Sequence, residues 1–213
     1  METPGKPLLS AQDLVRSYGG QPVLNGVSLT LHEGDRVGLI GRNGSGKSTL
    51  LRIMAALDTP DSGLITRSQG VRVSMLEQEC PLDRSLTVRA TLEAATADVR
   101  ALLHEYQYAM ERLAHTPGDC WEHTALQAEI DERARHLEAA DAWRLEEHIK
   151  RICVALGLPR GNRRLATLSG GELRRVDLAT KLIQHPDVLM LDEPTNHIDT
   201  RSAEWIERFL ENY

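Results

Sequence analysis

Residues 41–48 read Gly41-Arg42-Asn43-Gly44-Ser45-Gly46-Lys47-Ser48, which fits the pattern G-x-x-x-x-G-K-S/T of a phosphate-binding loop. Glycines let backbone N–H groups wrap around a phosphate, and the N-terminus of a following helix adds positive charge. Lys47 would then contact the β- and γ-phosphates of a nucleoside triphosphate, Ser48 would offer its hydroxyl to Mg²⁺, and Thr49 would add a further phosphate contact. The alternative is a chance glycine-rich turn.

The residues on either side of this loop have the patterns that a phosphate loop needs. Arg36–Ile40 predicts a short buried strand, and Leu50, Leu51, Met54 and Leu57 recur at helical spacing. A strand, a glycine-rich loop and a helix in this order favour phosphate binding over a chance turn.

Two carboxylates follow a second apolar strand. Val188–Leu191 predicts a buried strand, and Asp192 and Glu193 come directly after it. Ligands of α/β sheets bind beyond the carboxyl ends of the strands. Asp192 would therefore hold the Mg²⁺ shell, and Glu193 would act as the general base on an attacking water. An Asp-Glu pair without the loop motif would more often be a solvated turn.

A third motif, Leu168-Ser169-Gly170-Gly171-Glu172, precedes a predicted helix. Ser169 by itself predicts an N-cap, and the glycines predict a turn. On this alternative the motif has a structural role and no part in catalysis or binding. With the two motifs above, however, the pentapeptide resembles the signature segment of the ATP-binding cassette (ABC) ATPases. The resemblance implies an α/β P-loop NTPase core that binds ATP and Mg²⁺, with an N-terminal antiparallel β-subdomain and an inserted α-helical subdomain or arm.

The same resemblance covers further residues. It implies that Tyr18 stacks on adenine, that Gln78 contacts Mg²⁺ and the attacking water, and that Asp199 contributes to nucleotide binding. It also implies that Ser169–Glu172 act on a nucleotide bound by a different cassette, so that hydrolysis needs a second cassette. A core or turn aromatic remains the alternative for Tyr18, and a solvated strand end remains the alternative for Gln78.

The segment Glu193-Pro194-Thr195-Asn196-His197-Ile198-Asp199 resembles the soluble F subfamily more than transporters. Residues 142–158 and 204–210 are similar to the first cassette of Uup-type members. This implies an ATP-driven switch that acts on the ribosome, on tRNA or on branched DNA. The rivals are a nucleotide-binding subunit of a membrane transporter and a module that binds nucleotide or nucleic acid without hydrolysis.

Three stretches organise the chain. Short β-type segments, separated at Gly19-Gly20, Pro22 and Asn25-Gly26, predict a sheet-rich start. The middle third predicts one helix over residues 87–115, a second helix capped by Asp119 and a third capped by Asp141. We divide the chain into residues 1–79, 80–158 and 159–213. The resemblance further implies a cassette that is incomplete at its C-terminal end.

Composition excludes several classes of protein. The 213 residues carry 25 Lys plus Arg and 31 Asp plus Glu, for a net charge of −6, and 41% are hydrophobic, which is typical of a globular chain. No 18-residue apolar run and no secretory signal are found, so a cytoplasmic protein without membrane association is expected. Residues 84–151 hold nine basic and thirteen acidic residues, which argues against nucleic-acid binding by the arm's bulk charge.

Overall fold

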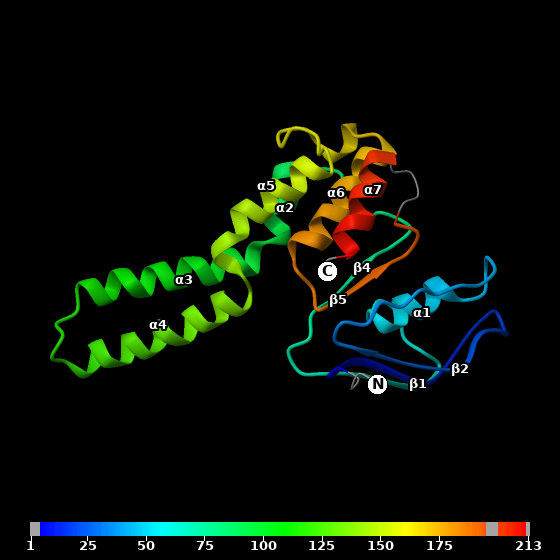
Figure 1. The fold of residues 1–213 in the computed structure, drawn as a ribbon, viewed down its shortest axis with the longest axis horizontal. Coiled ribbons are helices and arrows are strands. Elements are labelled where there is room, and N and C mark those ends of the chain that lie inside the picture. The colour runs from blue at the N-terminus through cyan, green and yellow to red at the C-terminus, as the bar shows by residue number, and fades with distance from the viewer. Residues whose placement is uncertain (1–4, 195–199, 212–213) are drawn as a thin grey trace. The chain divides into compact units, whose positions relative to one another are not determined.

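The computed structural model describes residues 5–194 and 200–211 (Figure 1). The chain divides into two compact units. Unit 1 comprises Met1–Pro81 and Pro186–Asn196, and unit 2 comprises Leu82–His185 and His197–Tyr213. The sequence-based division at residues 79 and 158 stays a prediction.

Unit 1 contains a three-stranded antiparallel sheet in the order β2-β1-β3, made of β1 (Pro7–Tyr18), β2 (Gln21–His32) and β3 (Ser62–Arg67). The predicted break at Asn25-Gly26 is wrong, because both residues lie within β2. Gly26 has a φ of 73° and is an extra residue where Leu14 pairs with Val27 and Val15 with Asn25. A β-bulge therefore absorbs the turn-like dipeptide without ending the strand.

Pro22 does not break the sheet either. It lies near the start of β2, opposite Ser17, and β2 is an edge strand whose one partner among residues 5–194 and 200–211 is β1. An edge strand tolerates a missing backbone N–H. The turn between β1 and β2 is formed by Gly19 and Gly20, with φ values of 57° and 80°.

A second sheet of unit 1 consists of β4 (Val73–Leu76) and β5 (Val188–Leu191), which pair in parallel with Leu76 opposite Leu191. The strand predicted at 188–191 is confirmed. Parallel pairing brings the segments that follow Leu76 and Leu191 to the same edge of the sheet. Residues far apart in sequence therefore meet at this edge.

The helix α1 (Lys47–Met54) begins at the end of the glycine-rich loop, as predicted, but Leu57 lies beyond it and is 47% exposed. The buried strand predicted at Arg36–Ile40 is wrong. In the described residues this segment pairs with no strand, and Ile40 is 99% exposed. An apolar run forms a strand only where a neighbouring strand completes its backbone hydrogen bonds, and β4 and β5 pair only with each other among the described residues.

The core of unit 1 joins the first sheet, α1 and the second sheet. Apart from Val71, which precedes β4, its buried apolar side chains come from these three elements: Leu9, Ala11, Leu14, Leu24, Leu50, Ile53, Met54, Val71, Met75, Val188 and Met190. This packing fixes α1, and with it the glycine-rich loop, against both sheets.

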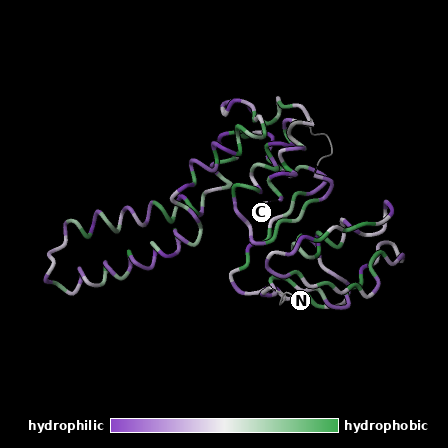
Figure 2. Tube along the Cα trace, viewed as in Figure 1, coloured by the Kyte–Doolittle hydropathy of each residue, from purple (hydrophilic) through white to green (hydrophobic). Residues whose placement is uncertain are grey.

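Unit 2 is helical. Its elements are α2 (Val88–Ala95), α3 (Ala97–Ala114), α4 (Trp121–Ala139), η1 (Ala142–Arg144), α5 (Leu145–Ala155), η2 (Leu165–Thr167), α6 (Gly170–Ile183) and α7 (Thr200–Glu211). The helices α3 and α4 form an antiparallel hairpin (Figure 1) that carries hydrophilic residues along its length (Figure 2). Among the helices that the structure describes, we find none whose length and apolar character would let it span a membrane.

The single helix predicted over residues 87–115 is wrong, because Thr96 separates α2 from α3. The Thr96 hydroxyl donates back to the carbonyls of Leu92 and Glu93, at 3.1 Å each, and Thr96 has a φ of −113°. This bonding to the preceding turn competes with the regular helix and bends the chain.

Both predicted aspartate caps are also corrected. The helix α4 has Cys120 at its N-cap rather than Asp119, with no side-chain cap hydrogen bond. Asp141 precedes the short η1 with a φ of 45°, and α5 begins at Leu145. Before α4 the chain has one further residue, Cys120, after Asp119, and before α5 the short 3-10 helix η1 lies between Asp141 and the regular helix.

Candidate functional site

The glycine-rich loop ends on a helix N-terminus in unit 1. Gly44 and Gly46 have φ values of 80° and 92°, which favour glycine. A Cβ built on Gly46 would lie 2.8 Å from the carbonyl oxygen of Val23 and 3.0 Å from Leu24 Cδ2. The loop backbone therefore approaches β2 closely, and this approach fixes where α1 starts.

The Lys47 side chain contacts the glycine-rich loop that precedes it. Its Nζ donates to the carbonyl oxygens of Gly41 at 2.9 Å and Arg42 at 3.0 Å. The first turn of α1 has no acidic residue, and Gly46 at its N-cap provides no side-chain hydrogen bond. The N-terminus of α1 therefore offers backbone N–H groups and the positive charge of Lys47, which together suit a phosphate.

The two strand-end carboxylates have different surroundings. Asp192 is 7% exposed, and its backbone N–H donates to the Leu76 carbonyl at 3.0 Å, continuing the β4–β5 pairing. Glu193 is exposed and has a φ of 49°, a left-handed conformation that is uncommon outside glycine. Strained backbone of this kind clusters at functional sites.

One cavity of about 330 Å³ brings several of the predicted residues together. Ser48 from the start of α1, Gln78 after β4 and Asp192 after β5 all line it. Their oxygen atoms form the hard donor set that Mg²⁺ prefers, with phosphate and water completing the shell. The residues present therefore fit a magnesium ion. Within the described ranges, no group of three or more His, Cys, Asp or Glu residues offers another metal site.

Arg52 forms an ion pair with Glu77 on the wall of this cavity. The pair links α1 to the segment that carries Gln78. Sequence patterns gave no indication of it, because the two residues lie 25 positions apart and neither belongs to a motif.

Tyr18, predicted to stack on adenine, lies at the end of β1 and is 46% exposed. Its hydroxyl donates to Asp58 Oδ2 at 2.6 Å, and the Arg16 guanidinium carbon lies 4.8 Å from the centre of its ring. The hydrogen bond from Tyr18, followed by that from the Thr59 backbone N–H, holds the pKa of the Asp58 carboxyl below its usual range. Arg16 and Asp58 belong to no sequence motif, and only the structure brings them to Tyr18.

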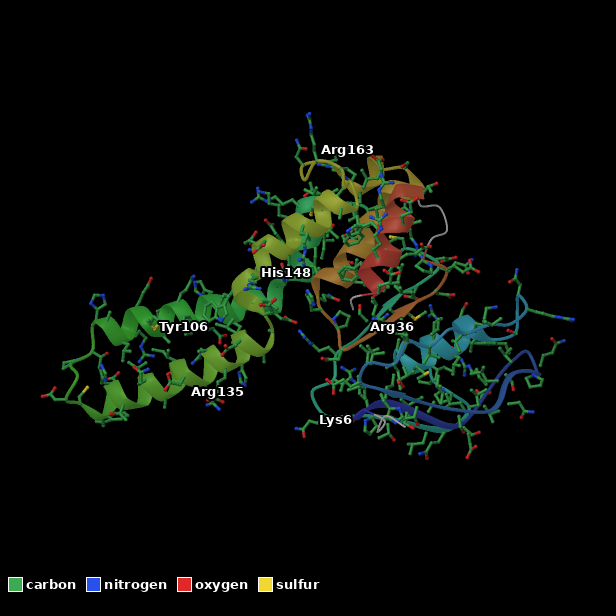
Figure 3. The ribbon with its side chains drawn as sticks, viewed as in Figure 1. Lys6, Arg36, Tyr106, Arg135, His148 and Arg163 are labelled. Atoms are coloured by element: carbon green, nitrogen blue, oxygen red, sulfur yellow. The ribbon has the colours of Figure 1, made fainter. Side chains whose placement is uncertain are left out.

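The signature residues lie in unit 2, at the start of α6. Ser169 is the N-cap, and its hydroxyl accepts from the Glu172 backbone N–H at 3.3 Å while Glu172 Oε2 accepts from the Ser169 N–H at 2.8 Å. Arg163, in the loop before α6 (Figure 3), donates to Glu172 Oε1 at 2.6 Å. The Ser169 N–H and then Arg163 hold the pKa of the Glu172 carboxyl below its ordinary value. Gly170 and Gly171 form the first turn of the helix.

The structure does not describe one of the predicted site residues. Asp199, with Thr195, Asn196, His197 and Ile198, lies outside the described residues. Arg174, which follows the signature segment in α6, is 6% exposed and therefore lies inside the fold.

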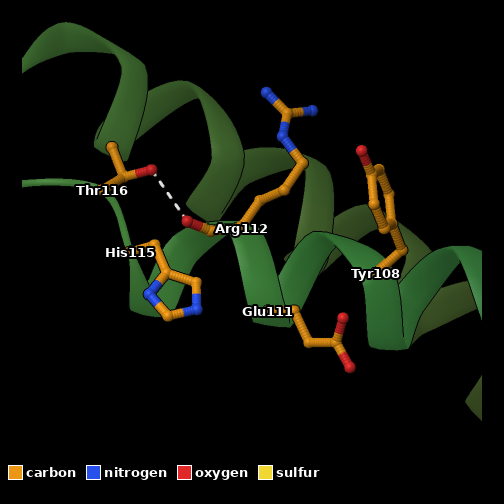
Figure 4. Close-up of a pocket in the computed structure, with 5 residues that line it drawn as sticks. All are labelled: Tyr108, Glu111, Arg112, His115 and Thr116. Atoms are coloured by element: carbon orange, nitrogen blue, oxygen red, sulfur yellow. Dashed lines mark hydrogen bonds between the residues drawn. The ribbon is translucent and has the colours of Figure 1, made fainter.

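A second cavity, of about 350 Å³, lies on the hairpin in unit 2 (Figure 4). Residues of the last turns of α3 and the turn after it line this cavity: Tyr108, Glu111, Arg112, His115 and Thr116. The Thr116 hydroxyl donates to the Arg112 carbonyl at 2.8 Å. None of the predicted site residues takes part, so this cavity is separate from the candidate site.

A family model described as "ABC transporter" matches residues 24–196. The chain belongs to this family. The prediction of an ATP-binding cassette is thereby confirmed, and the match runs from β2 through the phosphate loop and the signature helix to the residues that follow β5.

Three curated relatives align with nearly the whole chain. The energy-dependent translational throttle protein EttA of Mycobacterium tuberculosis is 37% identical over 93% of the chain and 35% of its own length. EttA of Escherichia coli is 38% identical over 90% of the chain and 34% of its own length. The uncharacterised ABC transporter ATP-binding protein YfmR of Bacillus subtilis is 36% identical over 97% of the chain and 32% of its own length. The chain thus spans about a third of each relative.

Solved structures share the fold. A putative ABC transporter ATP-binding protein from Pyrococcus furiosus has a TM-score of 0.62 and 22% identity, over 96% of this chain and 86% of that one. A dimeric ATP-binding cassette in a post-hydrolysis state, bound to ADP and Pi, has a TM-score of 0.63 and 23% identity, over 96% of this chain and 82% of that one. The predicted α/β P-loop fold with an N-terminal antiparallel sheet is confirmed. The resemblance of the chain to Uup-type members in particular remains a prediction.

Proposed function

We propose that this ABC cassette binds ATP and Mg²⁺ at the glycine-rich loop and the shared edge of β4 and β5, and hydrolyses ATP together with a second cassette. The observation that carries the proposal is the single cavity lined by Ser48, Gln78 and Asp192. Three segments that are distant in sequence supply oxygen donors beside a helix N-terminus with open N–H groups.

Each residue has a definite task in this proposal. The loop N–H groups of residues 41–46 bind the β-phosphate, and Lys47 exchanges its contacts with the carbonyls of Gly41 and Arg42 for phosphate oxygens. Ser48, Gln78 and Asp192 hold Mg²⁺, which supplies positive charge to neutralise the phosphate oxygens. Glu193 orients the attacking water and accepts its proton.

The need for a second cassette follows from the signature residues. Ser169–Glu172 present another helix N-terminus, α6, and we infer that it faces the γ-phosphate of a nucleotide bound by a partner cassette. A solved cassette of the same fold is described as a dimer bound to ADP and Pi, which supports the involvement of two cassettes. Asp199 would complete the same interface.

The test of the nucleotide site uses the two aspartates that flank β5. Asp192→Asn should remove most of the gain in ATP affinity that Mg²⁺ provides, about tenfold or more, because a carboxylate ligand is lost. Asp187→Asn is the matched control, since Asp187 precedes β5 and pairs with Arg72 at the opposite end of the strand. Calorimetric titration of ATP with Mg²⁺ and with EDTA measures the difference. An unchanged Mg²⁺ gain in Asp192→Asn excludes this site.

We further propose that the chain belongs to an F-subfamily protein and that this protein acts on the ribosome. The support comes from relatives whose names describe an energy-dependent translational throttle. In the protein that carries both cassettes, Glu193→Gln should retain ATP and co-sediment with ribosomes when ATP is present. The unmodified protein with ADP is the control. Capture of branched DNA or of a membrane subunit instead of ribosomes contradicts the proposal.

A further inference from the structure

The ring of Tyr18 is held by two side chains of unit 1, one from β1 (Arg16) and one from the loop after α1 (Asp58). Its hydroxyl donates to Asp58 Oδ2 at 2.6 Å, and Arg16 stacks on the ring with its guanidinium carbon 4.8 Å from the centre. Arg16 in turn donates to Asp58 Oδ1 at 3.0 Å and to Asp61 Oδ1 at 2.9 Å. Hydroxyl, guanidinium and carboxylates thus form one closed network around the aromatic ring.

This network connects Tyr18 to the helix that carries the phosphate loop. The backbone N–H groups of Leu57 and Asp58 donate to the Arg52 carbonyl in the last turn of α1, at 2.8 and 3.3 Å. The Ser17 backbone N–H donates to Asp61 Oδ2 at 2.7 Å. The end of β1 is therefore fixed relative to α1, and through α1 to the loop of residues 41–46.

One face of the Tyr18 ring is occupied by Arg16, while the residue as a whole is 46% exposed. A stacked base needs only one free aromatic face, and stacking depends on how well the ring is held in place. The hydroxyl bond to Asp58 prevents the ring from turning away into solvent.

We propose that Arg16 and Asp58 are positioning residues that hold the Tyr18 ring with a single face open to the adenine of ATP. The inference rests on the proposed ATP site. Neither residue touches the nucleotide; each acts through Tyr18. The phosphate loop binds phosphate without them, so their loss affects the base and not the triphosphate.

The experiment compares two ligands on the whole chain: ATP and inorganic tripolyphosphate, both with Mg²⁺. Asp58→Ala and Tyr18→Phe should each weaken ATP binding about three- to tenfold and leave the affinity for tripolyphosphate within about twofold. The double variant should lose no more than the single variants, because both remove the same contact. Asp58→Asn, which keeps an acceptor oxygen of similar size, should restore part of the ATP affinity.

Asp35→Ala is the matched control, since Asp35 also accepts a backbone N–H, from His32, but belongs to a turn outside the network. It should bind both ligands as the unmodified chain does. Equal losses for ATP and tripolyphosphate in Asp58→Ala, or no loss of ATP affinity, overturn the positioning role. An unmodified chain that binds neither ligand overturns the proposed function itself, so the two failures are distinguishable.

Discussion

Gly46 shows how a single residue fixes the nucleotide loop. Its φ of 92° and its contact with the Val23 carbonyl leave no room for a side chain, and the next residue begins α1. The motif requires this glycine for its phosphate, and the structure adds a second reason, the packing of the loop on β2.

Gly46→Ala should therefore destabilise the fold more than Gly44→Ala does. Both positions have positive φ, which costs about 1 kcal/mol for alanine, but only Gly46 also places the new Cβ 2.8 Å from a backbone oxygen. We expect a loss of about 2–4 kcal/mol at Gly46. Urea unfolding of the two variants measures the difference. Equal losses of unfolding free energy in the two variants would show that the close approach to Val23 does not add to the destabilisation.

Some features of these residues could be predicted from sequence and others could not. The spacing of Gly41, Lys47 and Ser48 is local, so the motif predicts their arrangement directly. The positive φ of Glu193 and the contact of Tyr18 with Asp58 depend on tertiary packing, across 40 residues in the second case. No periodicity or spacing in the chain encodes such contacts.

At the scale of elements, α6 is the best specified helix. Ser169 is the N-cap that the sequence predicts, the structure adds a capping box with Glu172, and Arg163 forms an ion pair with Glu172 from the preceding loop. The signature segment is therefore rigid for reasons that are independent of any nucleotide.

The capping box also predicts a pH dependence. The pKa of Glu172 is lowered in the folded protein, so its stabilising contribution is complete above the pKa of the unfolded chain and is lost as the pH falls through the folded pKa. Unfolding free energy should therefore decline as the pH falls below the ordinary pKa of a glutamate, and Glu172→Gln should make that decline shallower. Glu132→Gln, on an exposed part of α4, is the control. Identical pH slopes for the two variants would exclude a contribution from the capping box.

Some strands and helices can be predicted from their own sequence and others cannot. The strand at 188–191 is confirmed because an apolar run of four residues lies between clear boundaries, and it has β4 as its partner. Arg36–Ile40 also contains apolar residues, at Val37, Leu39 and Ile40, but pairs with no strand among the described residues. Strand formation depends on a partner that the local sequence does not contain, whereas helix breaks such as Thr96 depend on side-chain bonding within one turn.

At the scale of the molecule, the family match and the two units agree on an ATP-binding cassette with a helical insertion between the phosphate loop and the signature helix. Three ordered motifs were enough to predict this, because each belongs to a different part of the fold. The acidic balance of residues 84–151 is unlike a surface that binds nucleic acid through charge alone, so a ribosomal contact would depend on shape and local patches.

Calorimetric titration of the chain with ATP and Mg²⁺ shows whether ATP binds at the N-terminus of α1. We predict saturable binding by the unmodified chain, a loss of at least about tenfold in Lys47→Ala, and no loss in Lys6→Ala, an exposed lysine of the same unit (Figure 3). Equal affinity of Lys47→Ala and the unmodified chain, or no binding by either, would exclude ATP binding at this helix end.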